Sequence, residues 1–385
     1  MRIAYCPTKL TSERCADGAL GGAALKKKLK IAIAGVGLVG KRHAASLAQL
    51  QESALSAIVD PSEDGSAFAA SAGVPCYETL EALFDKNAPD GLVLATPTPL
   101  HVGQGLIAID RGCPVLVEKP LGTTAAEALA LVAASETSGV PLLVGHHRRH
   151  NPLIQKAHQV ISAGDLGELR AVQATCWFYK PDAYFDQAPW RKEKGAGPIS
   201  VNLVHDIDLL RYLCGEVKTV QALTAPSRRG YANEDVAGAV LGFANGAVGT
   251  LTVSDSIAAP WSWELTSREY PIYPPTPESC YLIGGSTGSL SVPDLRLWSH
   301  SDGAPDWWTP ISASSLTRAA SDPLVNQMAH FTSVVRGQTA PLVSGREGLR
   351  TLQVIEAIQK AGETGLVQYI KDLQVTEKHK ENEGA

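Results

Sequence analysis

A glycine-rich turn near the start of the chain constrains the fold more than any other feature. Residues 31–40 read IAIAGVGLVG, so an apolar run breaks into three glycines, and an acidic residue follows twenty positions after the last one. The first glycine permits a tight turn, the second lets the main chain approach a pyrophosphate, and the third allows close packing of the next helix. The amide groups at the start of that helix favour negative phosphates. The predicted dinucleotide-binding residues are Gly35, Val36, Gly37, Leu38, Val39, Gly40 and Asp60.

Length, charge and cysteine usage narrow the class of protein. A chain of 385 residues exceeds the size at which one hydrophobic core keeps growing, so we expect two domains. The net charge of −5 argues against a nucleic-acid partner, and no apolar stretch is long enough to cross a membrane. Seven scattered cysteines without a C-x-x-C pair fit reduced thiols and predict a cytoplasmic protein. Residues 1–28 lack the apolar core of a secretory signal and are expected to form a poorly ordered extension.

Residues 29–150 have the pattern of an α/β domain with a doubly wound parallel sheet. Short apolar runs alternate with amphipathic ones, and Leu92–Leu94 is apolar on both faces, which implies a sheet covered on each side. The predicted strands are 30–34, 54–59, 74–77, 91–95, 114–117 and 141–146. The predicted helices are 38–50, 63–72, 79–85, 100–111 and 124–138. Six strands complete a Rossmann domain.

The pattern changes after Pro152, where a second domain, 151–370, is predicted. Asn245-Gly246 between 236–243 and 247–254 predicts a β-hairpin in a region rich in β-branched and aromatic residues. Further helices are predicted at 198–213, 323–336 and 346–362. We expect an α+β domain with an open, mostly antiparallel sheet that binds substrate and covers its open face in a homodimer or homotetramer. Residues 371–385 are predicted to be a polar tail.

Polar residues follow several predicted strands of the first domain. In an open parallel sheet, ligands bind beyond the carboxyl ends of the strands. Lys119 ends a buried strand just before Pro120, so its ammonium group is expected to project into the cleft, where burial or a neighbouring cation lowers its pKa. The alternative is a lysine that reaches the surface or pairs with Glu118. The candidates at these strand ends are Thr96, Pro97, His101, Glu118, Lys119 and Arg149.

A second group of candidates lies on the predicted helix 198–213. Asn202 and His205 are three residues apart and share one helix face, and His205 and Asp208 repeat the spacing. A histidine that faces Lys119 from the second domain makes an acid–base pair for moving a hydroxyl proton. The alternative is a structural histidine on an amphipathic helix.

Four further residues are expected at the rim of the cleft. They are Tyr179, Lys180, Trp190 and Arg191. Aromatic faces suit stacking on a sugar-like ring and the cations suit a carboxylate or phosphate, with ordinary surface packing as an equal alternative. His146, His147 and His150 do not predict a metal site, because successive strand residues point to opposite faces and no ligating Cys or Glu accompanies them.

The ordered set of motifs resembles one known family. AGVGLVG (34–40), ATPTPLH (95–101), EKPL (118–121), RRHNP (148–152) and GAGPISVNLVHDIDLLRYLCG (195–215) are similar to the glucose–fructose oxidoreductase, inositol dehydrogenase and MocA family. In this context EKP is a specific signal, whereas the glycine triplet is not. The resemblance implies an NAD(P)-dependent dehydrogenase of sugars, polyols or related hydroxylated rings. It also implies that Lys119 is the catalytic lysine and His205 the histidine of the catalytic helix.

Val201 departs from the family pattern. Many members carry an Asp four residues before the histidine, whereas this chain has Val201 there and Asn202 beside it. Either Asn202 and Lys119 suffice, or the substrate differs from that of the polyol dehydrogenases, or the protein is an inactive nucleotide-binding regulator. The leading prediction is hydride transfer between a secondary hydroxyl of a sugar, cyclitol or related ring polyol and the nicotinamide. A dihydrodiol or a quinate-like hydroxy acid is the alternative substrate.

These observations define the predicted site. The catalytic residues are Lys119, His205 and Asn202, and the substrate contacts are Arg149, Tyr179, Lys180, Trp190, Arg191, Asn202 and His205. Thr96, Pro97, His101, Glu118 and Lys119 complete the cofactor contacts. Asp60 would bond both ribose hydroxyls and repel a 2′-phosphate, which favours NAD, although Ser62 could accommodate the phosphate of NADP with a small shift. No metal, nucleic acid or membrane partner is expected.

Overall fold

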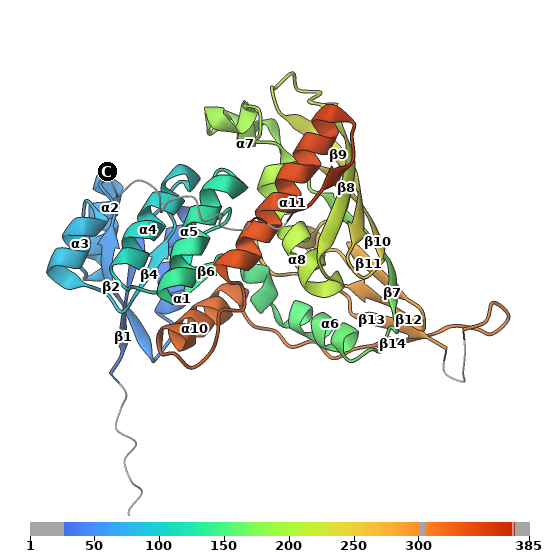
Figure 1. Ribbon diagram of the computed structural model, residues 1–385, viewed down its shortest axis with the longest axis horizontal. Helices are drawn as coiled ribbons and strands as arrows, with labels where there is room; N and C mark the ends of the chain where they lie inside the picture. Colours follow the sequence, from blue (N-terminus) through green and yellow to red (C-terminus); the bar gives the residue numbers. More distant parts are fainter. Residues whose placement is uncertain (1–26, 301–304, 372, 374–385) are drawn as a thin grey trace, which may run out of the picture.

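The computed structural model describes residues 27–300, 305–371 and 373 of the chain. Two sheets form two domains that share helices between them (Figure 1). The extension predicted for 1–28 lies outside the described residues except for Lys27 and Lys28, and the tail predicted for 371–385 lies outside them except for Lys371 and Leu373. No helix in these ranges is both long enough and apolar enough to cross a membrane.

The first domain is the Rossmann sheet that the alternating pattern predicts. Its six strands run parallel in the order β3-β2-β1-β4-β5-β6. The strands are β1 (Leu29–Ala34), β2 (Ser53–Val59), β3 (Cys76–Tyr77), β4 (Gly91–Leu94), β5 (Val115–Val117) and β6 (Leu142–Val144). The helices are α1 (Leu38–Leu47), α2 (Glu63–Ala72), α3 (Leu80–Asn87), η1 (Thr98–Leu100), α4 (His101–Asp110) and α5 (Ala125–Ser138). Every residue of β4, β5 and β6 is buried, as expected for a sheet covered on both faces.

Different sets of helices cover the two faces of this sheet. Helices α3, α4 and α5 pack on one face, and α1 and α2 pack on the other. The second face is completed by α10 (Pro323–Val335), whose Phe331 and Val334 pack in the same cluster as Ile31. A Cβ atom at Gly91 would lie only 2.9 Å from Val335, which shows how closely α10 approaches the sheet. The sequence assigned 323–336 to the second domain, but in the structure this segment returns to cover the first.

The second domain is built on a nine-stranded sheet. The strand order is β14-β13-β12-β11-β7-β10-β9-β8-β15, and all neighbours are antiparallel except β7 and β10. The strands are β7 (Leu169–Trp177), β8 (Val217–Pro226), β9 (Glu234–Phe243), β10 (Val248–Ser254), β11 (Tyr281–Gly285), β12 (Gly288–Val292), β13 (Arg296–Ser299), β14 (Ser312–Ser315) and β15 (Gln368–Tyr369). The hairpin predicted around Asn245-Gly246 is confirmed as β9 and β10.

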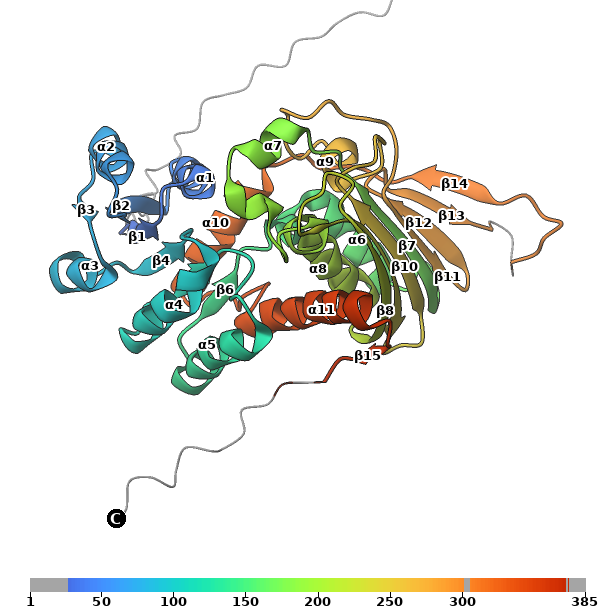
Figure 2. The ribbon, with the colours of Figure 1, turned by 90° about the horizontal axis from the view of Figure 1, so that it is seen from above.

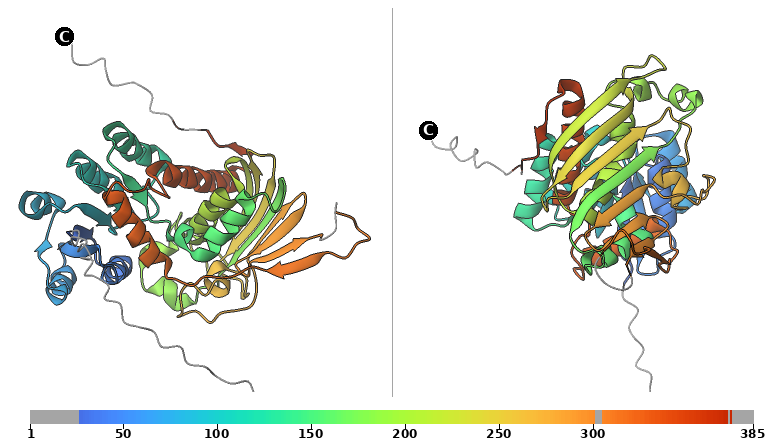
Figure 3. Two further views of the ribbon diagram at one scale, coloured as in Figure 1. Left: turned by 90° about the horizontal axis from the view of Figure 1, so that it is seen from below. Right: turned by 90° about the vertical axis from the view of Figure 1, so that its right-hand side faces the viewer.

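Helices cover only one face of the second sheet. Helices α6 (Pro152–Ser162) and α8 (Val204–Cys214) and the second half of α11 (Gly345–Thr364) pack there, and the right-hand view of Figure 3 shows the opposite face without a helix. Helix α11 runs from one domain to the other (Figure 2), since Leu352 joins the first core and Ile358 the second. The remaining short helices are η2 (His147–His150), α7 (Asp182–Asp186), η3 (Pro189–Lys192), η4 (Ile199–Leu203) and α9 (Trp263–Thr266).

Candidate active site

The glycine-rich turn between β1 and α1 has the geometry that its sequence predicts. Gly35 adopts φ +83°, and a Cβ atom there would lie 2.6 Å from a main-chain carbonyl oxygen after β4. A Cβ atom at Gly40 would lie 1.9 Å from the carbonyl oxygen of Gly35, so α1 packs directly on the turn. At Gly37 no atom lies within 4 Å of the Cβ position, and the next residues, Leu38 and Val39, are exposed. The turn is therefore closed on the protein side and open on the outer side, where a phosphate can approach the main chain.

Asp60 lies at the carboxyl end of β2, next to this turn. Its Oδ2 accepts a hydrogen bond of 3.0 Å from the main-chain N–H of Val36, and its Oδ1 accepts bonds from the main chain and hydroxyl of Ser62. Burial alone would raise the pKa of Asp60, but the hydrogen bonds from Ser62 and Val36 outweigh it and lower the pKa. The carboxylate is therefore ionised and fixed beside the glycines.

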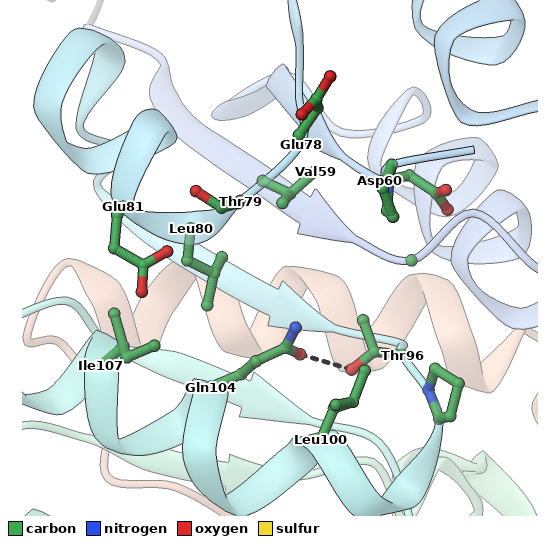
Figure 4. A pocket seen from close by; sticks show the side chains of 13 residues that line it. Val59, Asp60, Glu78, Thr79, Leu80, Glu81, Thr96, Leu100, Gln104 and Ile107 are labelled. Carbon is green, nitrogen blue, oxygen red and sulfur yellow. Dashed lines mark hydrogen bonds between the residues drawn. The ribbon is translucent and has the colours of Figure 1, made fainter. Parts of the chain in front are cut away.

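A cavity of about 560 Å³ opens beside Asp60 (Figure 4). Thr96 and Pro97, which follow β4, line one side, and Leu80 of α3 contributes an apolar surface. The hydroxyl of Thr96 donates to Oε1 of Gln104 over 2.6 Å, the bond drawn in Figure 4. A mixed apolar and acidic cavity at the carboxyl edge of this sheet is where ligands of such folds bind.

Glu118 and Lys119 follow β5 at a neighbouring strand end. Oε1 of Glu118 lies 2.7 Å from Nε2 of the fully buried His43, and Oε2 accepts a bond from the main-chain N–H of Lys119. Burial raises the pKa of Glu118, but the His43 bond and nearby positive charges lower it to about 2. Burial lowers the pKa of the Lys119 ammonium group, and Arg148 and Lys180 act in the same direction. A lysine that loses its proton more readily than usual is suited to accept one during catalysis.

His205 reaches the same region from α8 of the second domain. Its exposed fraction is 9%, and its ring centroid lies 5.6 Å from that of His147 and 6.3 Å from that of His146. Burial lowers the pKa of His205 well below its ordinary value, and the charge of Lys119 makes the largest electrostatic contribution. The imidazole is therefore neutral at pH 7. In the described part of the chain, no three His, Cys, Asp or Glu side chains form a metal-binding group.

Asn202 and Val201 lie on η4, a π-helical turn directly before α8. Gln359 of α11 donates to the hydroxyl of Ser200 over 2.8 Å, which ties this turn to the interdomain helix. Asn202 is 8% exposed, and neither its Oδ1 nor the Nδ1 of His205 bonds to any described residue. Single π-helical turns are frequent at functional sites. The turn thus presents Oδ1 of Asn202 without a partner, but Val201 supplies no carboxylate.

Arg148 is a buried residue of the site that sequence reasoning did not identify. Its Nη2 donates to Oε1 of Glu264 over 2.6 Å, and its Nη1 lies 3.9 Å from Oδ1 of Asp206, the residue after His205. Burial raises the pKa of Asp206 to about 6. Sequence reasoning also missed His43. The partner of His43 lies 75 positions away in the sequence and that of Arg148 lies 116 positions away, so no local pattern reveals either contact. The only sequence signal was the position of Arg148 inside the RRHNP motif.

Arg149, which was predicted to contact substrate, forms a buried ion pair in the structure. Its side chain is buried, and Nε and Nη2 donate to the two carboxylate oxygens of Asp208 over 2.9 and 2.8 Å. Nη2 also donates to Glu347 of α11. Charged groups in the interior require such partners. Through its bonds to Asp208 and Glu347, Arg149 links α8 to the interdomain helix α11.

His101 and Glu118 were predicted to contact the cofactor, and both side chains make hydrogen bonds within the protein. The Nδ1 and Nε2 atoms of His101 each lie 2.8 Å from a carbonyl oxygen, of Pro120 and Thr96 respectively, so the ring links two strand ends. Glu118 is occupied by His43 and the Lys119 main chain. Both residues follow strand ends as predicted, but they point into the protein.

The predicted rim residues divide into two pairs. Tyr179 and Trp190 are half exposed, and Trp190 lines a cavity of about 800 Å³ between the loops after β4 and β5 and helix α11. Lys180 is buried, with Nζ 3.7 Å from Oδ2 of Asp255, and burial lowers its pKa. Arg191 lies 4.0 Å above the ring of Tyr184 and is held against α7.

Two family models match this chain. The NAD-binding Rossmann fold of the GFO/IDH/MocA oxidoreductase family matches residues 29–146, and the GFO/IDH/MocA C-terminal domain matches residues 154–291. D-apiose dehydrogenase of Paraburkholderia graminis is 27% identical over 364 residues, which cover 90% of this chain and 91% of that protein. Inositol 2-dehydrogenase of Mycolicibacterium gilvum is 32% identical over 213 residues, or 53% of this chain and 58% of that protein.

A solved structure is similar over nearly the same length. The WlbA dehydrogenase from Bordetella pertussis, in complex with NADH and UDP-GlcNAcA, superposes with a TM-score of 0.72 at 25% identity. The superposition covers 90% of this chain and 100% of that one.

Proposed function

Because this chain belongs to the GFO/IDH/MocA family of NAD-binding oxidoreductases, we propose that it transfers hydride between a ring hydroxyl and NAD, with Lys119 and His205 handling the hydroxyl proton. The substrate class that we propose is a sugar, cyclitol or related ring polyol, and the named dehydrogenases of apiose and inositol support it. One observation carries the proposal. Burial lowers the pKa of both Lys119 and His205, and the charge of Lys119 acts on His205, which supports a shared site.

The residues present fit a nicotinamide dinucleotide. A Cβ atom would fill the turn at Gly35 and Gly40, whereas the outer side at Gly37 is open to a pyrophosphate. The ionised Asp60 is positioned to accept hydrogen bonds from ribose hydroxyls and to repel a 2′-phosphate, which favours NAD over NADP. When bound, the nicotinamide supplies the hydride acceptor.

We assign acceptance of the hydroxyl proton to Lys119. Its lowered pKa makes the neutral amine accessible, and the adjacent negative charge of Glu118 stabilises the ammonium group once it has formed. His205 is assigned the role of a neutral hydrogen-bonding partner, because burial and the charge of Lys119 both oppose its protonation. Asn202, with an unpartnered Oδ1, is assigned to orient a substrate hydroxyl in place of the Asp that Val201 replaces.

A substrate screen tests this proposal. The purified protein is mixed with NAD or NADP and a panel of sugars, cyclitols and ring acids, and absorbance is followed at 340 nm. We expect turnover of at least one neutral ring polyol and a preference for NAD. Stoichiometric NAD binding without any absorbance change would contradict the proposal and indicate a nucleotide-binding regulator. Activity on ring acids but not on neutral sugars, lost in Arg191→Ala, would select the quinate-like class instead.

We also propose that the uncovered face of the second sheet joins copies of the chain in a homodimer or homotetramer. Leu223, Val240, Val248 and Leu282 are exposed on four strands of this face, which supports its being covered by another copy. Sedimentation analysis would contradict this assignment by showing only monomer. The cysteines of the described residues form no disulfide, which supports our assignment of the protein to the cytoplasm.

A further inference from the structure

Glu264 is a carboxylate with only one of its two oxygens occupied. Oε1 accepts the 2.6 Å bond from Arg148, whereas Oε2 is buried and makes no hydrogen bond with any residue in the described ranges. The side chain is 12% exposed. A buried carboxylate oxygen is costly to leave unpaired, so its position in the structure points to a ligand that completes it.

The side chain of Glu264 is firmly held. Glu264 belongs to the short helix α9. The preceding residue of this helix, Trp263, stacks on Tyr281 with 6.0 Å between the ring centroids. The guanidinium of Arg148 lies 5.6 Å from the centroid of the Trp263 ring while it binds Glu264. Packing of this kind fixes the orientation of the free oxygen before any ligand arrives.

Contacts of Arg148 connect Glu264 to the helix that carries His205. Arg148 connects it to Asp206, which follows His205 directly on α8. The charge of Glu264 acts on the ammonium groups of both Lys119 and Lys180.

Building on the proposed function, we propose that Oε2 of Glu264 accepts a hydrogen bond from a second hydroxyl of the ring substrate and thereby selects neutral polyols over ring acids. A hydroxyl can donate to this oxygen, whereas a substrate carboxylate has no proton to donate at pH 7 and is repelled by it. Nη1 of Arg148 lies 3.9 Å from Oδ1 of Asp206 and Nζ of Lys180 lies 3.7 Å from Oδ2 of Asp255, so carboxylates of the protein already lie beside both cations.

A binding comparison of two similar rings tests the proposal. Myo-inositol and quinate are both hydroxylated six-membered carbocycles, but only quinate carries a carboxylate. Isothermal titration of the full chain saturated with NADH should show myo-inositol binding at least about tenfold more tightly than quinate, the scale of a hydrogen bond to a charged group. In Glu264→Gln the amide oxygen can still accept from Arg148 while the amide N–H₂ replaces the free acceptor. The ratio of the two dissociation constants should therefore move toward quinate by about tenfold or more.

Glu278→Gln is the matched control, because Glu278 is an exposed carboxylate whose only hydrogen bond in the described residues is from Trp261. This variant should keep the wild-type ratio. Quinate binding as tightly as myo-inositol to the wild type, an unchanged ratio in Glu264→Gln, or no binding of either ring would each overturn the role of Glu264. A shifted ratio without turnover of any substrate in the absorbance screen would overturn the proposed function alone.

Discussion

The buried pair of His43 and Glu118 gives the most quantitative prediction of this structure. The His43 side chain is fully buried and that of Glu118 is 10% exposed, so solvent screens their 2.7 Å contact little. Burial opposes ionisation of Glu118, yet the His43 bond and nearby cations hold its pKa at about 2 instead of 4.5. That difference in pKa corresponds to roughly 3 kcal/mol. The hydrogen bond and the charge of His43 are the two largest causes that lower the pKa of Glu118. His43→Leu should therefore cost about 3 kcal/mol, since it leaves a buried carboxylate without its partner.

Guanidinium denaturation at pH 7 and at lower pH values measures this cost. The folded-state pKa of Glu118 lies below the unfolded value, so its contribution is complete above about pH 4.5 and disappears as the pH falls toward 2. The difference between wild type and His43→Leu should be largest at pH 7 and shrink below pH 4.5. Adding Glu118→Gln to His43→Leu should restore stability, because the buried charge is gone. A loss below about 1 kcal/mol at pH 7, or no recovery in the double variant, would refute the reasoning.

Three further predictions concern the cofactor and the proton. Lys119→Ala should lower turnover at least about a hundredfold while NAD affinity changes little, and near-normal turnover would remove Lys119 from the mechanism. Asp60→Ala should relax discrimination against NADP in paired KM measurements, and an unchanged preference would show that Asp60 does not contact the ribose. Gly40→Ala should fail to fold normally, because its Cβ atom would lie 1.9 Å from Gly35, whereas Gly37→Ala should keep the wild-type melting temperature. NADH fluorescence titration should nevertheless show at least about tenfold weaker binding to Gly37→Ala, and wild-type affinity there would mean that the pyrophosphate does not approach this turn.

The fold of the first domain was predictable because its signals are local. Each parallel strand is followed by its covering helix, so Leu92–Leu94 and the glycine turn reveal the layers within a short stretch of sequence. The placement of α10 was not predictable in this way. Its apolar face fits either domain, and only the space left on the Rossmann sheet beside Ile31 decides where it packs.

The site was predictable where the position of a residue in its strand or helix determines the direction of its side chain. Lys119 follows a strand end and His205 lies on a helix, as the local sequence predicts, and their meeting in one cleft stays a prediction. Arg149 was expected there too, but its buried partner Asp208 lies 59 positions away, and no local pattern shows that the two meet. Arg148 and Glu264 were missed for the same reason, since only the tertiary fold brings such distant partners together.

Transfer of deuterium from substrate to cofactor tests the central claim most directly. The ring polyol that gives turnover in the absorbance screen is labelled with deuterium at its secondary carbinol carbon and incubated with NAD and the protein, and the NADH formed is analysed by mass spectrometry. We predict one deuterium on each NADH formed by the wild type, and a rate at least about a hundredfold lower for Lys119→Ala. Unlabelled NADH, or label transfer at the wild-type rate without Lys119, would contradict the account.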